Sequence, residues 1–241
     1  MRLSPIKVKF FWLAFFVAAA IFLSVNPFEM RLVTAATRNF MALTVISADS
    51  RNEPDAEELK PKIISRKDWE AKAPVGQGKE HTIRSITIHH TATPQKKEIV
   101  IERKMQNLQK FSQTESPLAN GKLKPVWFDI PYHFYIAVDG KIAEGREIGF
   151  AGDTNTNYDP TGHALIVVEG NFETEQPTDE QLTSLTKLTA WLAAKYKVPT
   201  AEIKVHNDFA ATACPGVNLK KLIPGLIEKV DKIIKSTNKS N

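Results

Sequence analysis

The amino-acid sequence predicts an α/β protein: a central mixed β-sheet flanked by α-helices, with an N-terminal hydrophobic helix ahead of it. Residues 83–90 alternate between apolar and polar side chains, as a strand does. Alternating runs around Asp139-Gly140 predict a hairpin. Apolar side chains recur at helical spacing after Thr178 and Leu219. Because strands and helices mix along the chain and one strand pair is a hairpin, we expect a mixed sheet.

The amino terminus has the composition of a targeting segment. An apolar run over residues 10–25 follows three basic residues, Arg2, Lys7 and Lys9, which is the order of a secretory signal. The run is slightly short for a membrane-spanning helix. Two interpretations stay open: an uncleaved membrane anchor, or a signal peptide with small residues at 34–36 as its cleavage site. Either one predicts export to the periplasm or cell exterior, with this segment contacting the membrane or the export machinery.

Composition divides the rest of the chain. Residues 50–61 are polar, charged and interrupted by prolines, which is typical of a linker. We assign residues 1–36 to the signal peptide or anchor, residues 37–61 to a linker, and residues 62–236 to one folded domain. A domain of that length can bury a core without disulfides.

The first half of the domain predicts a strand, a helix and a loop. After the strand at 83–90, residues 99–111 carry apolar side chains at helical spacing. Residues 112–124 are polar and contain proline, asparagine and glycine, which predicts a loop.

Turn residues mark the hairpin that follows. Its strands are residues 132–138 and 141–144, and Asp139-Gly140 predicts a turn with positive φ at both central positions. A short apolar run at 165–168 then predicts a buried strand.

Two helices close the chain. Thr178 and Gln181 predict a capping box at the start of the first helix, and Pro199 marks its end. The second helix is predicted over residues 219–234, with an apolar stripe along one face.

Composition also limits the function classes. The net charge of +5 and the pI near 9.1 fit either an ordinary basic surface or attraction to a polyanion. No nucleic-acid-binding motif is present, so we expect no nucleic-acid partner. Cys214 is the only cysteine, which excludes an intramolecular disulfide. Its thiol is then either buried and inert or a ligand.

Histidine and cysteine gather in two segments. The first holds the pair His89-His90, and the second holds His206 and Cys214, which are eight positions apart. Imidazole nitrogen and thiolate sulfur are the usual ligands of zinc, and three protein ligands plus water are typical of a catalytic site. The spacing is too wide for a structural zinc knuckle, and it suits a loop that returns to place a second ligand.

Strand geometry distinguishes the two adjacent histidines. Neighbouring residues on a strand point to opposite faces. His90 shares a face with Ile86 and Ile88, the expected core face, whereas His89 shares the other face with Thr87. We therefore assign the ligand to His89. The remaining histidines are interpreted as core or surface residues: His81, His90, His133 and His163.

Five segments, in order along residues 62–235, resemble the zinc amidases of the type 2 amidase and peptidoglycan recognition protein superfamily. Each is a weak signal alone, and together they are specific. They are the arginine- and tryptophan-containing stretch 63–71, the strand 86–92, the segment 130–134, the hairpin 139–146, and the pair His206 and Cys214.

The resemblance implies an N-acetylmuramoyl-L-alanine amidase, which hydrolyses the amide bond between N-acetylmuramic acid and L-alanine in bacterial peptidoglycan. It implies a Zn²⁺ cofactor held by three ligands, His89, His206 and Cys214. It implies catalytic roles for Tyr132 and Thr212, which would orient water or donate a hydrogen bond to the oxyanion. The superfamily also contains non-catalytic peptidoglycan receptors, which generally lack the cysteine, so Cys214 favours the enzyme. We expect a peptidoglycan substrate and a monomer.

Two stretches depart from the family pattern. Many relatives carry an asparagine-serine-isoleucine-glycine run where this chain has Gly-His-Ala-Leu at 162–165. The loop over residues 112–126 is longer than in compact relatives, and it either lines the substrate groove or lies outside it. Glu169 lies near the catalytic glutamate of cytoplasmic members but is displaced, so we interpret it as structural.

Overall fold

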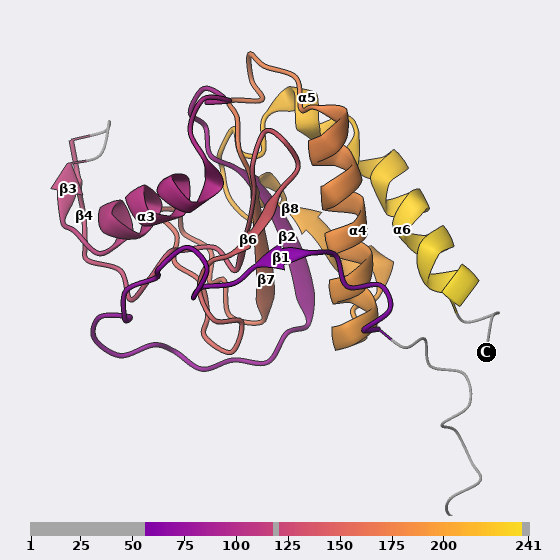
Figure 1. The fold of residues 1–241 in the computed structure, drawn as a ribbon, viewed down its shortest axis with the longest axis horizontal. Helices are drawn as coiled ribbons and strands as arrows, with labels where there is room; N and C mark the ends of the chain where they lie inside the picture. The colour runs from indigo at the N-terminus through magenta and orange to yellow at the C-terminus, as the bar shows by residue number, and fades with distance from the viewer. Residues whose placement is uncertain (1–55, 118–120, 238–241) are drawn as a thin grey trace, which may run out of the picture. The chain divides into compact units, whose positions relative to one another are not determined.

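The computed structural model describes residues 56–117 and 121–237 (Figure 1). The predicted apolar segment 10–25, the cleavage site at 34–36 and most of the predicted linker lie outside the described residues. Within the described part of the chain, no helix has both the length and the apolarity needed to span a bilayer.

A six-stranded sheet forms the centre of the domain, in the order β1-β6-β5-β7-β2-β8. Only β5 and β6 pair antiparallel, as the two arms of the hairpin, and the other four pairings are parallel. The predicted mixed sheet is therefore confirmed. The strands are β1 (Ile63–Ile64), β2 (Ser85–His90), β5 (Phe134–Ile136), β6 (Ile142–Glu144), β7 (His163–Val168) and β8 (Ile203–Val205).

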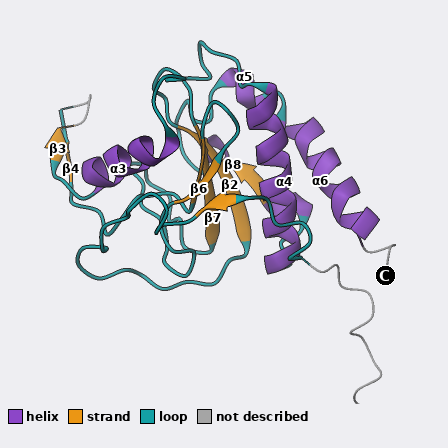
Figure 2. Ribbon diagram, viewed as in Figure 1, coloured by secondary structure: helices purple, strands orange, loops and turns teal. Residues whose placement is uncertain are grey.

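Helices cover both faces of this sheet (Figures 1 and 2). One face packs against α4 and α6, and the other packs against α3. Alternation within β5 separates the two cores, because Phe134 and Ile136 join the first while Tyr135 joins the second. The helices are α3 (Ile101–Ser112), α4 (Asp179–Tyr196), α5 (Val217–Lys220) and α6 (Ile223–Thr237), and a small separate hairpin joins β3 (Ser116–Pro117) to β4 (Leu123–Lys124).

The start of α4 confirms the predicted capping box. The Thr178 hydroxyl accepts a hydrogen bond from the backbone N–H of Gln181 at 3.1 Å, and the Gln181 side chain accepts one from the backbone N–H of Thr178 at 3.1 Å. Two otherwise unpaired helix-end donors are thereby satisfied. The predicted stripe faces the sheet, because Leu185 and Leu188 are fully buried.

The prediction of one final helix over residues 219–234 is wrong in one respect. The segment forms two helices, α5 and α6, which are separated at Lys221 and Leu222. Pro224 explains the break, because proline lacks an N–H and its ring clashes with the carbonyl four residues earlier in a continuous helix. After the break, α6 packs its apolar face against α4.

The hairpin turn also differs from the prediction. Gly140 has φ 77°, but Asp139 is not in the left-handed region. Two hydrogen bonds close a longer loop: Gly140 N–H donates to the Ala137 carbonyl, and Ala137 N–H donates to the Lys141 carbonyl, both at 2.9 Å. A three-residue loop of this kind requires positive φ only at its last position. A Cβ at Gly140 would also lie 2.8 Å from the carbonyl oxygen of Glu180.

Candidate functional site

The two adjacent histidines of β2 point to opposite faces of the sheet, as their alternation predicts. His90 points into the core that contains Ile86 and Ile88, and its Nδ1 accepts a hydrogen bond from Phe172 N–H at 3.3 Å. His89 points away from that core and lines a pocket. The imidazole of His89, and not that of His90, therefore joins the group of candidate ligand atoms.

Neighbouring parallel strands bring two of the candidate ligands together. His89 lies near the carboxyl end of β2, and His206 directly follows the adjacent strand β8. Carboxyl ends of parallel strands meet at one edge of a sheet, and here the two imidazole rings lie 4.6 Å apart. Cys214 returns to this point on the loop after His206, where Asn207 N–H donates to the Cys214 carbonyl at 3.0 Å.

The donor atoms of His89, His206 and Cys214 all lie within 4.8 Å of one another. Nδ1 of His89 is 3.6 Å from Sγ of Cys214. Two such donors bound to one tetrahedral zinc ion would lie roughly 3.5 Å apart, so the donor set fits zinc. Three protein ligands would leave a fourth coordination position for water or substrate. Among residues 56–117 and 121–237, no other such group of His, Cys, Asp or Glu side chains occurs.

Burial keeps both imidazoles in the form that binds metal. Desolvation, with a smaller contribution from His206, holds the pKa of His89 well below its usual value. Desolvation also lowers the pKa of His206 to about 4. Burial raises the pKa of Cys214 to about 12, although the His90 N–H at 3.4 Å from the sulfur opposes the rise. The thiol therefore keeps its proton until a cation displaces it.

Tyr132 and Thr212 line the same pocket as the three candidate ligands. The Tyr132 ring lies 5.2 Å from the His89 ring. Burial raises the Tyr132 pKa above its usual value, so its hydroxyl keeps a proton to donate. The Thr212 hydroxyl accepts a hydrogen bond from Cys214 N–H at 3.2 Å. That bond uses an oxygen lone pair, which leaves the hydroxyl proton for a second partner.

The pocket continues as a groove away from the candidate ligands. Its volume at the ligands is about 330 Å³, and a neighbouring hollow of about 470 Å³ shares five lining residues with it. These shared residues join the two hollows into one surface: Thr91, Trp127, Pro131, Tyr132 and Asn155. An extended substrate could thus lie along the groove with one bond at the candidate metal.

The long loop after α3 supports the wall of this groove. Lys124 is fully buried, and its ammonium donates to the carbonyls of Ser112 at 2.9 Å and Pro125 at 2.7 Å. The same ammonium lies 4.6 Å from the centre of the Trp127 ring and 5.2 Å from that of Phe111. Because both rings line the groove, the loop fixes part of the groove wall.

Replacing Lys124 with methionine should loosen this wall without removing metal. The change deletes two hydrogen bonds from a charged donor and a cation–π contact, so we expect a loss of about 2–3 kcal/mol in the free energy of unfolding. We also expect unchanged zinc content, because Lys124 is not among the candidate ligands. Thermal unfolding and zinc analysis measure the two effects. Lys110→Met, a change at an exposed position of α3, is the control, and equal effects in both variants would contradict the wall role.

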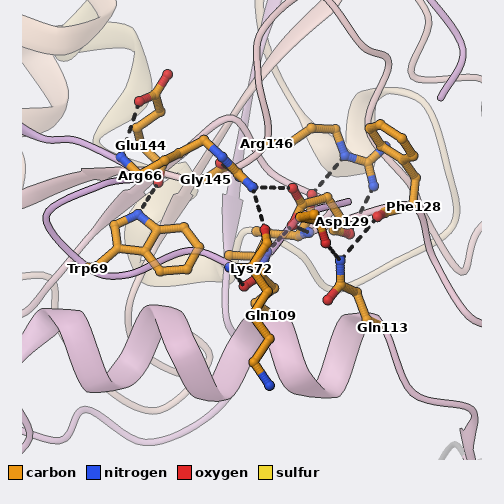
Figure 3. A network of polar contacts seen from close by, with 12 residues as sticks. Arg66, Trp69, Lys72, Gln109, Gln113, Phe128, Asp129, Glu144, Gly145 and Arg146 are labelled. Atoms are coloured by element: carbon orange, nitrogen blue, oxygen red, sulfur yellow. Dashed lines mark hydrogen bonds and ion pairs between the residues drawn. The ribbon is translucent and has the colours of Figure 1, made fainter. Parts of the chain in front are cut away.

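A buried ion pair anchors the segment that carries Tyr132 (Figure 3). Asp129 is fully buried, and its Oδ2 lies 2.7 Å from Nη2 of Arg66. Its Oδ1 accepts a hydrogen bond from the Gln109 side chain at 2.9 Å. Arg66 belongs to the stretch 63–71, so this pair joins that stretch to α3 and to the approach to Tyr132.

Arg146 belongs to the same network (Figure 3). Its guanidinium donates to the carbonyls of Asp129 at 2.9 Å and Ile130 at 2.8 Å, and it forms an ion pair with Asp153. Asp153 lines the pocket. The arginines of the family motifs therefore act as scaffold: they hold two pocket-lining segments in place.

Glu169, interpreted from the sequence as structural, makes several buried contacts and also lines the second hollow. Its buried carboxylate lies 2.7 Å from Lys104 Nζ and accepts hydrogen bonds from the N–H groups of Lys96 and Val138. Sequence reasoning did not find the pocket residues Trp127 and Thr156, nor Tyr158, whose hydroxyl lies 3.5 Å from Nε2 of His89. Trp127 follows the long loop, and the other two lie in a polar stretch with no motif, so their only signal was the presence of side chains that can donate or accept hydrogen bonds.

Comparison with known sequences gives relatives of two kinds. The profile of the Amidase_2 family, described as N-acetylmuramoyl-L-alanine amidase, matches residues 79–217. Peptidoglycan-recognition protein SD of Drosophila melanogaster is 30% identical over 169 residues, which span 67% of this chain and 83% of that protein. The endolysin of Escherichia phage T7 is 32% identical over 100 residues, which span 39% of this chain and 64% of the endolysin.

Solved structures give the same two kinds of relative. The crystal structure of Drosophila peptidoglycan recognition protein SD has a TM-score of 0.58 and 27% identity, and the match covers 68% of this chain and 94% of that one. The endolysin amidase LysCS from Clostridium intestinale URNW has a TM-score of 0.54 and 27% identity, with 69% and 95% covered. The family profile spans more than half of the sequence, and the chain therefore belongs to the Amidase_2 family of N-acetylmuramoyl-L-alanine amidases.

Proposed function

We propose that this protein is a zinc-dependent amidase that hydrolyses the bond between N-acetylmuramic acid and L-alanine in bacterial peptidoglycan. The observation that carries the proposal is the grouping of His89, His206 and Cys214 at an open pocket in a chain of this family. Two imidazoles and one thiolate are a ligand set that leaves room for substrate or water.

The site residues have two roles in this proposal: three would bind the metal, and two would stabilise the charge that develops on the substrate. His89, His206 and Cys214 would hold the zinc ion, which when bound polarises a carbonyl and lowers the pKa of water. The Tyr132 hydroxyl donates a hydrogen bond to the scissile carbonyl oxygen as that oxygen gains negative charge. The Thr212 hydroxyl, already oriented by Cys214 N–H, is a second donor for the same oxygen.

The alternative function is that of a non-catalytic peptidoglycan-binding receptor. Peptidoglycan recognition proteins among the relatives favour it, and the groove beyond the candidate ligands is compatible with binding alone. Cys214 favours the enzyme, because a buried thiol placed 3.6 Å from an imidazole nitrogen is not needed for a receptor groove.

Analysis of the reaction products separates these functions. Peptidoglycan incubated with the protein should release stem peptides with new L-alanine amino termini and no new reducing sugar ends, as identified by mass spectrometry. Binding without any new terminus would support the receptor. New reducing ends without free alanine would indicate a glycosidase and contradict the amidase.

We further propose that the catalytic domain works outside the cytoplasmic membrane, where intact peptidoglycan lies. The apolar run 10–25 with basic residues before it supports export, either cleaved or as an anchor. Protease added to spheroplasts of the native host should digest the domain. A full-length protein that stays in the cytosol and is protected from the protease would contradict export.

A further inference from the structure

Two hydroxyl groups outside the candidate ligand set contact the ligand histidines. Thr156 Oγ1 lies 2.9 Å from Nε2 of His206, and the Tyr158 hydroxyl lies 3.5 Å from Nε2 of His89. Both come from the loop between β6 and β7. We propose that Thr156 and Tyr158 are positioning residues that set the ring orientation and tautomer of the two histidines, an inference that rests on the zinc site of the proposed function.

The two nitrogens of the His89 ring have different neighbours. Its Nδ1 faces Cys214 Sγ at 3.6 Å, and its Nε2 faces Tyr158. A neutral imidazole carries one N–H and one lone pair. If Nδ1 gives its lone pair to the metal, Nε2 carries the proton and needs an acceptor. The Tyr158 oxygen supplies that acceptor, and contacts of this kind orient a ligand ring.

Thr156 acts on His206 through a short chain of hydroxyl groups. Its Oγ1 lies 2.8 Å from Thr154 Oγ1, and its own N–H donates to Thr154 Oγ1 at 3.1 Å. When Thr156 Oγ1 accepts a hydrogen bond from the Nε2–H of His206, its own hydroxyl can donate a hydrogen bond to Thr154 Oγ1. The Nε2–H of His206 and the Thr156 hydroxyl then each have an acceptor, and the lone pair of His206 is left on Nδ1.

An aromatic cluster holds Tyr158 in this position. Its ring stacks on Phe209 at 5.5 Å with an interplanar angle of 16°, and it lies 5.1 Å from the His206 ring. His163 also belongs to the cluster, and its ring centre lies 5.8 Å from that of Tyr158. Nδ1 of His163 lies 2.8 Å from Thr87 Oγ1. His163 belongs to the 162–165 stretch that departs from the family pattern, and the cluster gives that departure a role.

The loop that carries both hydroxyl groups is fastened at its two ends. At the first end, Arg146 donates to the Ala151 carbonyl and pairs with Asp153. At the second end, Gly162 N–H donates to His81 Nδ1 at 2.8 Å, and Arg84 N–H donates to the Gly162 carbonyl at 2.7 Å. Fixed ends let the loop hold the two rings before metal arrives, which is the requirement for a positioning role.

Zinc affinity tests the inference directly. The dissociation constant is measured on the full chain by competition with a chromophoric chelator. Thr156→Val removes the acceptor and keeps the shape, so zinc should bind about 10- to 100-fold more weakly. Thr156→Ser keeps the hydroxyl and should bind close to wild type. Tyr158→Phe should also weaken binding and alter the visible absorption of the Co²⁺-loaded protein, because the His89 ring loses its orientation.

Thr161→Val is the matched control, because it removes a hydroxyl from the same loop without touching a histidine. It should leave zinc affinity unchanged. Wild-type affinity in both Thr156→Val and Tyr158→Phe would overturn the inference, as would an equal loss in Thr161→Val, which would indicate general loosening of the loop. Circular dichroism shows whether each variant folds. If Thr156→Val does not fold, the zinc affinity of Tyr158→Phe tests the inference alone. A wild-type chain that binds no zinc would instead remove the proposed function, and this inference with it.

Discussion

Cys214→Ser is expected to lose bound zinc and hydrolytic activity together. The substitution removes the single sulfur donor, which lies 3.6 Å from His89 Nδ1 and completes the three-ligand group. Metal contributes several kcal/mol of charge stabilisation in hydrolases, and each 1.36 kcal/mol is tenfold in rate, so we expect a loss of about 10³-fold or more. Metal analysis of the purified protein and hydrolysis of peptidoglycan measure the two losses, and His206→Ala should give the same result.

His90→Ala is the control for this prediction. His90 is adjacent to the candidate ligand His89, but it points into the core and bonds to Phe172 N–H. The variant should be less stable and should still bind zinc. Full zinc content and activity in Cys214→Ser would refute the ligand assignment. A metal-free His90→Ala beside a metal-loaded His89→Ala would show that the other histidine is the ligand.

Tyr132→Phe is expected to fold and bind zinc but to lose about 10²–10³ in kcat, the scale of one oxyanion donor. The ring keeps its place 5.2 Å from His89, and only the hydroxyl that lines the pocket is removed. Burial holds that hydroxyl protonated, so the loss should not depend on pH near neutrality. Single-turnover kinetics with a muropeptide, together with zinc analysis, measure the effect.

Tyr196→Phe controls for the loss of any tyrosine hydroxyl, because Tyr196 ends α4 and does not line the pocket. It should turn over at the wild-type rate. A Tyr132→Phe rate close to wild type would leave Tyr132 with only a packing role. A variant that loses zinc as well would indicate that the hydroxyl supports the metal site and not the reaction.

Local patterns predicted the parts of this fold that depend on local physics. Alternation along β2 separated His89 from His90, because one face of that strand joins the apolar core through Ile86 and Ile88, whereas the other face carries Thr87 and His89. The capping box of Thr178 and Gln181 was predicted for the same reason: its partners are three residues apart. The break before α6 also has a local cause, Pro224. It was not predicted because the apolar stripe over residues 219–234 favoured one continuous helix.

Long-range contacts explain what the sequence could not predict. Lys124 reads as an exposed loop lysine, yet it is buried beneath Trp127 by the fold of the segment after α3. Thr156 and His206 are fifty positions apart, and no spacing rule joins them. The grouping of His206 with His89 was predicted from family resemblance. Strand order supplies its physical cause, because β8 follows β7 in sequence but pairs with β2 in space.

The pairing of β2 with β8 also limits which ions the site can accept. Two of the candidate ligands are attached to hydrogen-bonded strands, and neighbouring strands keep a spacing of about 4.8 Å. The distance between the two strands cannot change to suit the radius of the bound ion. Cys214 alone sits on an irregular loop, so accommodation of a larger or smaller ion falls on the loop between His206 and Cys214. If the site binds metal as proposed, its ion selectivity would depend on the length and stiffness of this loop, because the spacing of the two strands is fixed.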